Sequence, residues 1–268
     1  MDEKLALSAS QQADYDEFKR LIHKRTGIDL GLYKPQQMHR RLLGMVERAN
    51  VKSFAEYFRV IDSNPDEWTA FLDRMTINVS ELFRNPEKWE ELRTQILPRM
   101  LTGGRALKVW SAGCSFGAEP YTLAMILADL APSVRHSLTA TDIDQKILQK
   151  AQRGIFTEAD VKNVPPAAKA RYLKPRGADY EVAPSIRDRI AFRRHNLLAD
   201  RFEADHDLIV CRNVVIYFTE QAKDELFRRF AAALRPGGVL FVGGTERVFN
   251  AREIGLESKI PFFYERVR

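Results

Sequence analysis

From about residue 105 onward, short apolar runs alternate with segments of helical character. Four of the runs have the length and composition of buried strands, at residues 106–110, 137–144, 207–213 and 239–244. Helical segments follow the first three of them, at residues 119–130, 145–154 and 219–234. Strands joined by helices of this length pair in parallel, because each connection has to cross back over the sheet. The pattern therefore predicts an α/β domain, with a parallel sheet and helices on both of its faces.

The alternation is interrupted between residues 163 and 194. Prolines fall here at positions 165, 166, 175 and 184, together with two short alternating segments at 179–183 and 190–194. Proline is poorly tolerated inside helices and central strands. We therefore expect a small antiparallel β insertion at about 165–194, whose end can contribute one strand to the main sheet. The final run, residues 262–267, is predicted to be an edge strand.

The first hundred residues carry helix signals and no strand-like alternation. Helix starts are indicated at Ser53, Asn64-Pro65 and Asn85-Pro86. Serine and asparagine cap helix N-termini, and proline suits the first helical turn. We expect an N-terminal all-helical domain in residues 1–84, which includes the start of a linker, and the sheet domain in residues 85–268.

Composition excludes several classes of protein. The two cysteines, Cys114 and Cys211, form no close pair and the five histidines lack metal-ligand spacing, so we expect neither a disulfide scaffold nor a metal. The most apolar stretch is interrupted by Asp129 and falls well short of the roughly 18 residues that suggest a membrane span. The N-terminus lacks the apolar core of a secretory signal. We expect a cytoplasmic protein that does not insert into a membrane.

The net charge of +6 is concentrated near the N-terminus. Between Lys19 and Arg48 there are eight lysines and arginines against two acids, which accounts for the whole excess. A basic block this local favours an acidic partner. The block alone leaves open whether that partner is nucleic acid, lipid or acidic protein, or whether the block is only a solvated helix face.

A glycine-containing loop follows the first predicted strand, at the end of the sheet where ligands bind. Gly113 and Gly117 would let the backbone approach a ligand closely, and Asp142 would accept hydrogen bonds from ribose hydroxyls. Glu119 would repel a pyrophosphate, so it favours a cofactor with positive charge and no phosphate. S-adenosylmethionine, which carries a sulfonium and an ammonium group, fits this description. The loop therefore favours methyl transfer over the alternative of an empty strand-to-helix turn.

Five motifs together resemble the chemotaxis receptor methyltransferases of the CheR type. They are residues 74–84 (RMTINVSELFR), 110–125 (WSAGCSFGAEPYTLAM), 140–144 (ATDID), 195–198 (HNLL) and 210–218 (VCRNVVIYF). The resemblance covers nearly the full length. It implies a Rossmann-like class I methyltransferase sheet domain. It also implies methyl transfer from S-adenosylmethionine to glutamate side chains of chemoreceptors, which forms glutamate 5-O-methyl esters and S-adenosylhomocysteine.

The resemblance also implies site residues. Cofactor contacts are expected from Asn78, Ser80, Arg84, Glu119, Asp142, Asn196, Leu197, Asn213 and Val214. Arg84 and Tyr217 are expected near the transferred methyl group, as the catalytic residues. Two positions depart from the usual Thr-Gly-Glu-Glu-Pro of the family, because Phe116 and Ala118 replace the threonine and the first acid. We expect weaker polar support for this loop, and not a loss of cofactor binding.

Under this resemblance the basic block has a specific partner, the acidic methylation helices of chemoreceptors. A helix is predicted from Pro35 to about residue 49, with a basic ridge beside an apolar stripe. The stripe consists of Met38, Leu42 and Met45. The ridge residues that we assign to substrate docking are Arg40, Arg41 and Arg48.

Some family members also bind a pentapeptide tether at the receptor C-terminus through a loop that contains glycines. The corresponding stretch here, residues 174–182, is short and has only Gly177. We therefore expect a protein that does not need the tether.

A glutamate side chain has a pKa of about 4.3 and is already ionised at pH 7, so its methylation needs no general base. No convincing base is evident in the sequence.

Two other functions stay open at this point. The chief alternative is a non-catalytic module that senses S-adenosylmethionine and binds an acidic protein. A nucleic-acid methyltransferase is the second, but Asn213-Val214 stands where amino-group methyltransferases have Asp/Asn-Pro-Pro-Tyr. We expect no nucleic-acid partner.

Overall fold

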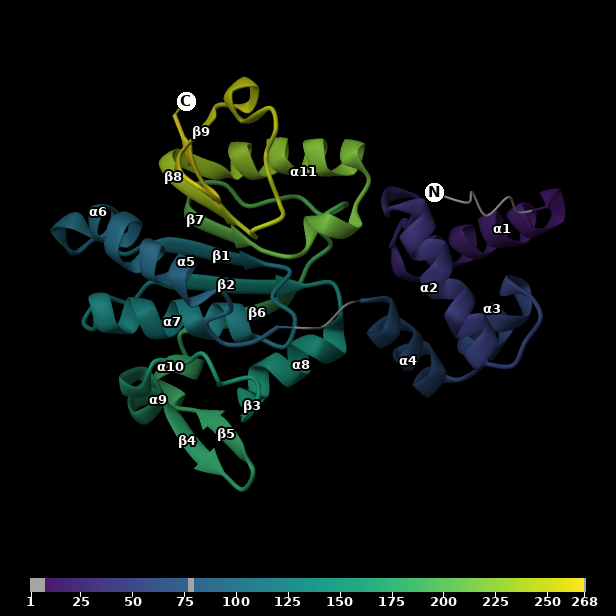
Figure 1. The fold of residues 1–268 in the computed structure, drawn as a ribbon, viewed down its shortest axis with the longest axis horizontal. Coiled ribbons are helices and arrows are strands. Elements are labelled where there is room, and N and C mark those ends of the chain that lie inside the picture. Colours follow the sequence, from purple (N-terminus) through teal and green to yellow (C-terminus); the bar gives the residue numbers. More distant parts are fainter. Residues whose placement is uncertain (1–7, 77–79, 268) are drawn as a thin grey trace. The chain divides into compact units, whose positions relative to one another are not determined.

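The computed structural model describes residues 8–76 and 80–267, and the chain divides into two compact units (Figure 1). The helical unit comprises Met1–Ile77 and Tyr217–Lys223, and the sheet unit comprises Asn78–Ile216 and Asp224–Arg268. In the described ranges no helix is both long and apolar enough to cross a membrane.

Helices make up the described N-terminal part of the helical unit. They are α1 (Ala9–Thr26), α2 (Pro35–Arg48), α3 (Phe54–Ser63) and α4 (Pro65–Met75). As predicted, Ser53 and Asn64 cap α3 and α4, and each side-chain oxygen accepts a backbone N–H of the first turn. α2 occupies the predicted range, and its stripe of Met38, Leu42 and Met45 is buried. Burial of this stripe fixes which side of α2 faces solvent.

A segment from the far end of the chain, Tyr217–Lys223, completes the helical unit. The Lys34 N–H donates to the Tyr217 carbonyl at 2.9 Å, and the Thr219 N–H donates to the Leu32 carbonyl at 2.9 Å. These are contacts between residues nearly two hundred positions apart, so no local sequence pattern could predict them. They place Tyr217 in the helical unit.

A mixed sheet of seven strands forms the centre of the sheet unit. In spatial order the strands are β6 (Ile190–Arg194), β2 (Ser137–Asp142), β1 (Lys108–Ala112), β7 (His206–Cys211), β8 (Leu234–Val242), β10 (Phe263–Arg266) and β9 (Leu256–Ile260). The first five pair in parallel, and β10 is antiparallel to both of its neighbours. The predicted parallel pairing is therefore confirmed from β6 to β8, and an antiparallel pair of strands extends the sheet beyond it.

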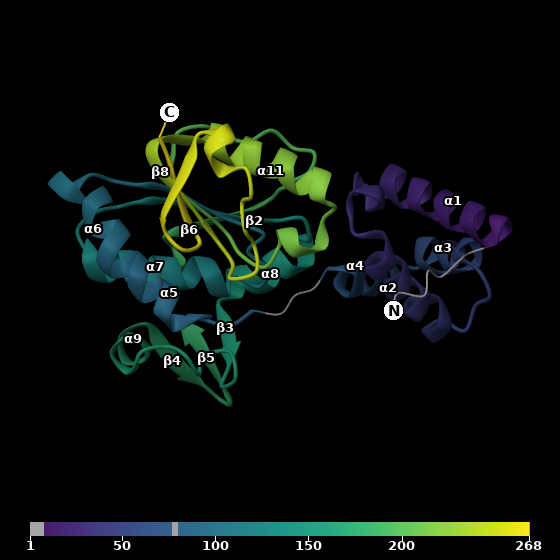
Figure 2. The same cartoon turned by 45° about the horizontal axis from the view of Figure 1, so that its top comes forward.

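Helices cover both faces of the sheet, as predicted (Figure 1 and Figure 2). α7 (Ala118–Leu130) lies on one face and α11 (Glu220–Ala233) on the other. Two further α-helices, α5 (Pro86–Glu91) and α6 (Leu97–Met100), precede β1 in the chain, and α8 (Gln145–Arg153) follows β2. α7 is buried over almost its whole length, which explains why its sequence is apolar on all sides.

The predicted edge strand at 262–267 is an inner strand, β10, because β9 adds to the sheet beyond it. β9 escaped prediction because its central residues, Glu257 to Lys259, are polar and exposed. Charged residues of this kind are typical of an edge strand, where they discourage pairing with other chains.

A small antiparallel sheet interrupts the main alternation. Its strands, in order, are β3 (Ile155–Thr157), β5 (Asp179–Val182) and β4 (Leu173–Arg176), with α9 (Pro166–Tyr172) and α10 (Pro184–Arg187) beside them in sequence. The insertion therefore starts about ten residues before the predicted 165–194. Residues 190–194 form β6, which pairs in parallel with β2 in the main sheet, as the sequence allowed.

A buried carboxylate stands at the amino end of β7. Asp207 is 2% exposed and accepts hydrogen bonds from the Lys108 N–H (2.7 Å), from Arg105 Nη2 (2.6 Å) and from Arg235 Nε. Burial alone would raise the pKa of Asp207, but these three donors together hold it below its usual value. This group of hydrogen bonds stabilises the amino ends of the parallel strands. The candidate site, described below, lies at their carboxyl ends.

Candidate functional site

Glu119 stands in the first turn of α7, behind the loop that follows β1. Its Oε1 accepts a hydrogen bond from Ser111 Oγ at 2.7 Å, while Oε2 accepts none from the residues that the structure describes. Burial raises the pKa of Glu119 to about 7, although the Arg212 guanidinium acts in the opposite direction. A carboxyl group in this state would ionise fully once a cation approached its unbonded oxygen.

Asp142 ends β2 beside the same loop. Its Oδ2 accepts a hydrogen bond from the Ser115 N–H at 2.8 Å, and its Oδ1 accepts one from the Asp144 N–H at 3.1 Å. The Gly113 N–H donates to the Thr141 carbonyl at 2.8 Å, so the loop after β1 is tied to the end of β2. Burial raises the pKa of Asp142, against the effect of the backbone donors. Each carboxylate oxygen keeps capacity for a further hydrogen bond.

The loop after β7 packs directly on the loop after β1. A Cβ atom on Gly113 would lie 2.5 Å from Val214 Cγ2, and the φ of Gly113 is +81°, so only glycine fits there. Asn213 also has a left-handed backbone, with φ of 59°. The buried Glu246 accepts hydrogen bonds from the N–H groups of Asn213 (2.7 Å) and Val214 (2.8 Å). The two loops therefore form one tightly packed edge.

Arg84 belongs to a loop that the buried Arg212 ties to the end of β7. Arg212 Nη2 donates to the Arg84 carbonyl at 3.0 Å and to Asn85 Oδ1 at 2.9 Å, and its guanidinium lies over the Trp89 ring, 5.1 Å from the centroid. Both arginines lower the pKa of Glu119, Arg212 more strongly than Arg84. The two guanidinium groups and Glu119 thus act on one another electrostatically within the sheet unit.

Asn196 and Leu197 follow β6 at the same edge of the sheet. Both are buried. The His195 N–H donates to the Asp142 carbonyl at 2.9 Å, and the Leu197 carbonyl accepts a hydrogen bond from Arg229 Nη1 at 2.7 Å. These bonds hold the turn after β6 next to the acid that ends β2.

The sheet unit brings most of the predicted cofactor residues together at the carboxyl ends of the parallel strands. They are Arg84, Glu119, Asp142, Asn196, Leu197, Asn213 and Val214. Ser80 is half-buried at the start of the second described range, and Asn78 lies outside the described residues. Tyr217 belongs to the helical unit. Sequence reasoning missed Arg212 and Glu246, although the charge of Arg212 immediately after the apolar end of β7 is an available signal. Glu246 follows β8 only after three further residues, so it carries no such signal.

The two departures from the family's loop are packing changes. Phe116 is 6% exposed, its ring centroid lies 5.9 Å from that of Phe156 in β3, and Lys150 Nζ lies 4.8 Å above it. Ala118 is fully buried. The loop therefore gains an apolar contact with the small sheet where a threonine hydroxyl would stand.

Neither cysteine is an activated nucleophile. Cys114 and Cys211 are both buried, and burial raises the pKa of each thiol well above its usual value. Across residues 8–76 and 80–267, no group of three or more histidine, cysteine or acidic side chains is placed to hold a metal ion.

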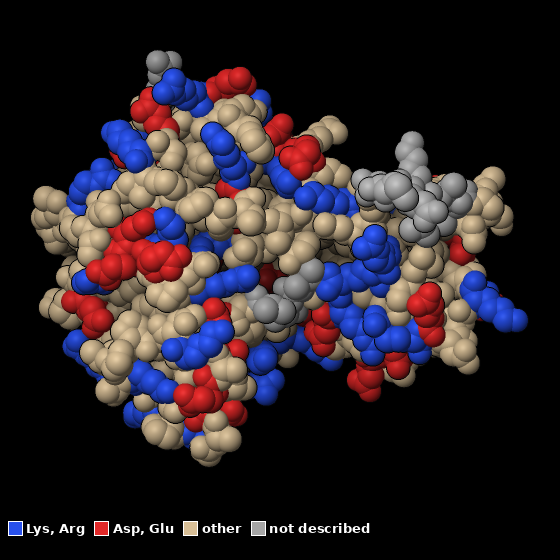
Figure 3. Space-filling view, viewed as in Figure 1, with Lys and Arg blue, Asp and Glu red and all other residues tan. Residues whose placement is uncertain are grey.

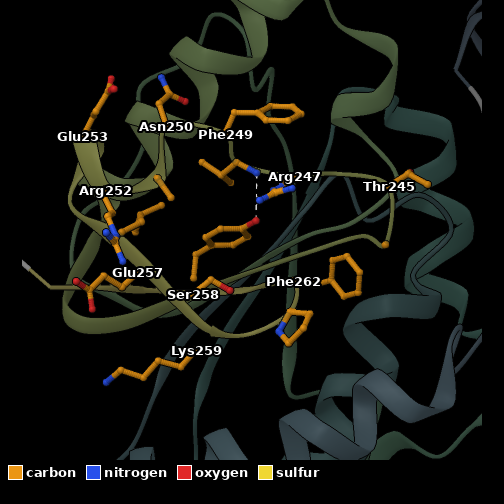
Figure 4. A pocket seen from close by; sticks show the side chains of 16 residues that line it. Thr245, Arg247, Phe249, Asn250, Arg252, Glu253, Glu257, Ser258, Lys259 and Phe262 are labelled. Carbon is orange, nitrogen blue, oxygen red and sulfur yellow. Dashed lines mark hydrogen bonds between the residues drawn. The ribbon is translucent and has the colours of Figure 1, made fainter.

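A hollow of about 850 Å³ adjoins the loop that follows β8. Figure 4 shows Thr245, Arg247 and Phe249 along this loop, with Glu257 on the opposite side of the hollow. Glu246, in the same loop, does not line the hollow. The loop therefore turns Glu246 inward, toward the end of β7, and its neighbours outward.

The predicted docking residues lie on α2 in the helical unit, where Figure 3 shows lysine and arginine side chains gathered on the visible face. Arg40 and Arg48 are exposed. Arg41 is half-buried, and its Nε donates to the Arg74 carbonyl at 2.7 Å. Arg41 therefore joins α2 to the end of α4, and the exposed charge comes mainly from its two neighbours.

The strand order, with Asp142 at the end of β2 and Glu119 in the first turn of α7, is consistent with one class of protein, the Rossmann-like methyltransferases that use S-adenosylmethionine, and the family match below assigns the chain to it. The chain belongs to the CheR methyltransferase family. Residues 78–260 match the CheR methyltransferase SAM binding domain, and residues 13–76 match the CheR methyltransferase all-alpha domain. The resemblance inferred from the motifs is thereby confirmed.

Relatives extend this similarity over both units. The chain is 39% identical over 254 residues to a chemotaxis protein methyltransferase of Listeria monocytogenes. The aligned region covers 94% of this chain and 97% of that protein. It is 35% identical over 257 residues to the chemotaxis protein methyltransferase of Escherichia coli, with 92% and 87% covered. The chain is thus an S-adenosylmethionine-dependent methyltransferase of the chemotaxis type.

Proposed function

We propose that this protein transfers a methyl group from S-adenosylmethionine to glutamate side chains of chemoreceptors, forming glutamate 5-O-methyl esters. The observation that carries the proposal is the charge environment of Glu119. The guanidinium groups of Arg212 and Arg84 both lower the pKa of Glu119, whereas Glu246 raises it. Two cationic side chains beside the carboxyl group suit an acceptor that is itself already ionised, as a glutamate is at pH 7.

The residues at the sheet edge fit the cofactor. Glu119 Oε2, which no described residue bonds, would hold the ammonium group, and Asp142 would accept from the ribose hydroxyls. Asn196 with Leu197 would contact the adenine edge, and Asn213 with Val214 would line the methionyl part. When bound, S-adenosylmethionine supplies an electrophilic methyl group that a carboxylate oxygen attacks, releasing S-adenosylhomocysteine. Ser80 and Asn78 stay proposed contacts.

Arg84 would orient the acceptor carboxylate through its other oxygen, because a guanidinium clamped on the attacking oxygen would hold back its charge. Arg84→Lys is expected to lower kcat by about tenfold or more and S-adenosylhomocysteine affinity by roughly threefold at most, since lysine cannot reproduce the planar fork. Receptor methylation kinetics and calorimetry check this. Equal losses in both would make Arg84 a cofactor ligand only. Tyr217 stays a proposed neighbour of the transferred methyl group.

Transfer of labelled methyl from tritiated S-adenosylmethionine to receptor tests the function directly. We expect the label to be released by mild alkali, because an ester is hydrolysed where N-methyl and C-methyl groups are not. Binding of S-adenosylhomocysteine without any transfer would support the sensing module instead. Alkali-stable label on nucleic acid would support the second alternative.

We further propose that the helical residues 1–84 dock the acidic methylation helices, that residues 85–268 bind the cofactor, and that the C-terminal receptor tether is not required. Exposed arginines act mainly through long-range attraction, which salt screens over roughly 8 Å at physiological strength. Arg40→Glu with Arg48→Glu is therefore expected to raise KM for receptor several-fold and to flatten its salt dependence. Cofactor affinity should not change.

Two features make this docking experiment specific. Arg41, although assigned to the same ridge, is left intact because it bonds to the Arg74 carbonyl, so its reversal would also disturb the helix packing. Lys52→Glu with Arg59→Glu changes the net charge equally at exposed positions before and within α3, outside the basic block, and serves as the control. An unchanged receptor KM at low salt, or an equal rise in the control, would place the docking face elsewhere.

A further inference from the structure

Glu246 is a buried carboxylate whose hydrogen bonds all go to the backbone. Its side chain is 2% exposed, and no described lysine or arginine forms an ion pair with it. It accepts from four N–H groups, those of Asn213 (2.7 Å), Val214 (2.8 Å), Val215 (2.9 Å) and Gly243 (2.7 Å). Both carboxylate oxygens are engaged, each by two donors, so the group is fixed in position and orientation.

Three of these donors are consecutive residues in the loop after β7. The first of them, Asn213, has a left-handed φ of 59°, a conformation that asparagine adopts more readily than most residues other than glycine. The second, Val214, presses against Gly113 so closely that a Cβ there would lie 2.5 Å from Val214 Cγ2. One side chain from the loop after β8 thus determines the path of the loop after β7.

Glu246 lies on the inner side of the loop after β8 and contacts the loop after β7 from there. Its neighbours Thr245 and Arg247 line the hollow on the outer side of their loop (Figure 4), whereas Glu246 points toward the end of β7. A buried carboxylate is tolerated only where donors compensate for its lost hydration. Four backbone donors do so here, and the same bonds make the loop after β7 rigid.

We infer that Glu246 is a positioning residue, which fixes Asn213 and Val214 in the geometry that the cofactor requires. The inference rests on the proposed function, because it takes these two residues as the contacts of the methionyl part. Glu246 itself need not touch the cofactor. Its effect on binding passes through the backbone of the loop after β7.

Glu246→Gln tests this role in the full-length protein. Glutamine keeps one acceptor oxygen but turns an amide NH₂ toward two of the N–H donors, which leaves both unsatisfied. Calorimetry with S-adenosylhomocysteine should show binding about tenfold weaker than in the wild type. The KM for receptor should stay unchanged, since the docking surface is not altered.

The matched control is Asp207→Asn, which removes another buried carboxylate that accepts from backbone and side-chain donors. Asp207 lies at the opposite end of the sheet, so this variant should lose stability but keep its affinity for S-adenosylhomocysteine. A decrease in affinity that matched that of Glu246→Gln would overturn the inference, because the effect would then follow from stability alone. Unchanged affinity in Glu246→Gln would also overturn it.

A second variant covers the case in which Glu246→Gln does not fold. Alanine at Gly243 would place a Cβ 2.5 Å from Glu246 Oε2 and 3.0 Å from the Asn213 nitrogen, so it displaces the carboxylate without removing it. Gly243→Ala should weaken S-adenosylhomocysteine binding several-fold, and wild-type affinity in this variant would contradict the inference. Failure of the wild type itself to bind S-adenosylhomocysteine would instead contradict the proposed function.

Discussion

S-adenosylhomocysteine is expected to bind about tenfold more tightly at pH 8 than at pH 6, because burial raises the pKa of Glu119 to about 7 in the free protein. The ionised carboxylate is the form that pairs with the ammonium group of the ligand. Below pH 7 most of the free protein holds a proton on Glu119 that has to leave on binding, and above pH 7 this proton is already gone. Calorimetry at the two pH values measures the change. Buffers of different ionisation enthalpy should also report proton release at pH 6.

Substitution of Glu119 separates this effect from other titrations. Glu119→Gln keeps the acceptor for Ser111 Oγ but cannot titrate, so the affinity difference between pH 6 and pH 8 should disappear. Glu119→Ala and Asp142→Ala should each weaken binding at pH 8 by about 1–3 kcal/mol, the value of a charge-assisted hydrogen bond. Affinity that is unchanged in both alanine variants would remove the cofactor assignment. A pH dependence that persisted in Glu119→Gln would belong to another group.

The parts of the fold that sequence could predict are those encoded by local pattern. The parallel strands β1, β2 and β7 are short apolar runs, and the caps at Ser53 and Asn64 follow from the chemistry of one side chain. The acids of the site were also within reach, because Asp142 lies near the carboxyl end of one predicted strand and Glu119 begins the helix that follows another. Ligands bind at this end of the strands in open α/β sheets.

The parts that escaped prediction depend on contacts between distant residues. The pairing of Tyr217–Lys223 with residues 32–34 joins segments that no periodicity links. Arg41 has the helical spacing expected of a solvent-exposed ridge, yet its Nε donates a hydrogen bond to the Arg74 carbonyl at the end of α4. Glu246 and Arg212 act on loops that lie far from them in sequence, so a charged residue near an apolar strand shows only that a partner must exist.

Asp207→Asn is expected to lower the free energy of unfolding by about 2–3 kcal/mol at pH 7, the upper range for loss of a buried, hydrogen-bonded charge. The carboxylate is 3% exposed in its side chain, whereas its partners Arg105 and Arg235 are 45% and 33% exposed. Their exposure keeps the loss below the value for a fully buried pair, since water can solvate the arginines that remain. Urea unfolding of the wild type and the variant measures the difference.

The same substitution should show a defined pH dependence. The folded pKa of Asp207 lies below its usual value, so its contribution is complete above the ordinary aspartate pKa of about 3.9 and is lost as the pH falls through the lower folded pKa. The stability difference between wild type and variant should therefore be constant from pH 5 to pH 7 and shrink below about pH 4. Glu203→Gln is the control, because Glu203 pairs with Lys108 and Arg193 but is 60% exposed and should change stability by less than about 0.5 kcal/mol. A difference that stayed constant down to pH 3 would show that Asp207 contributes through shape and not through its charge.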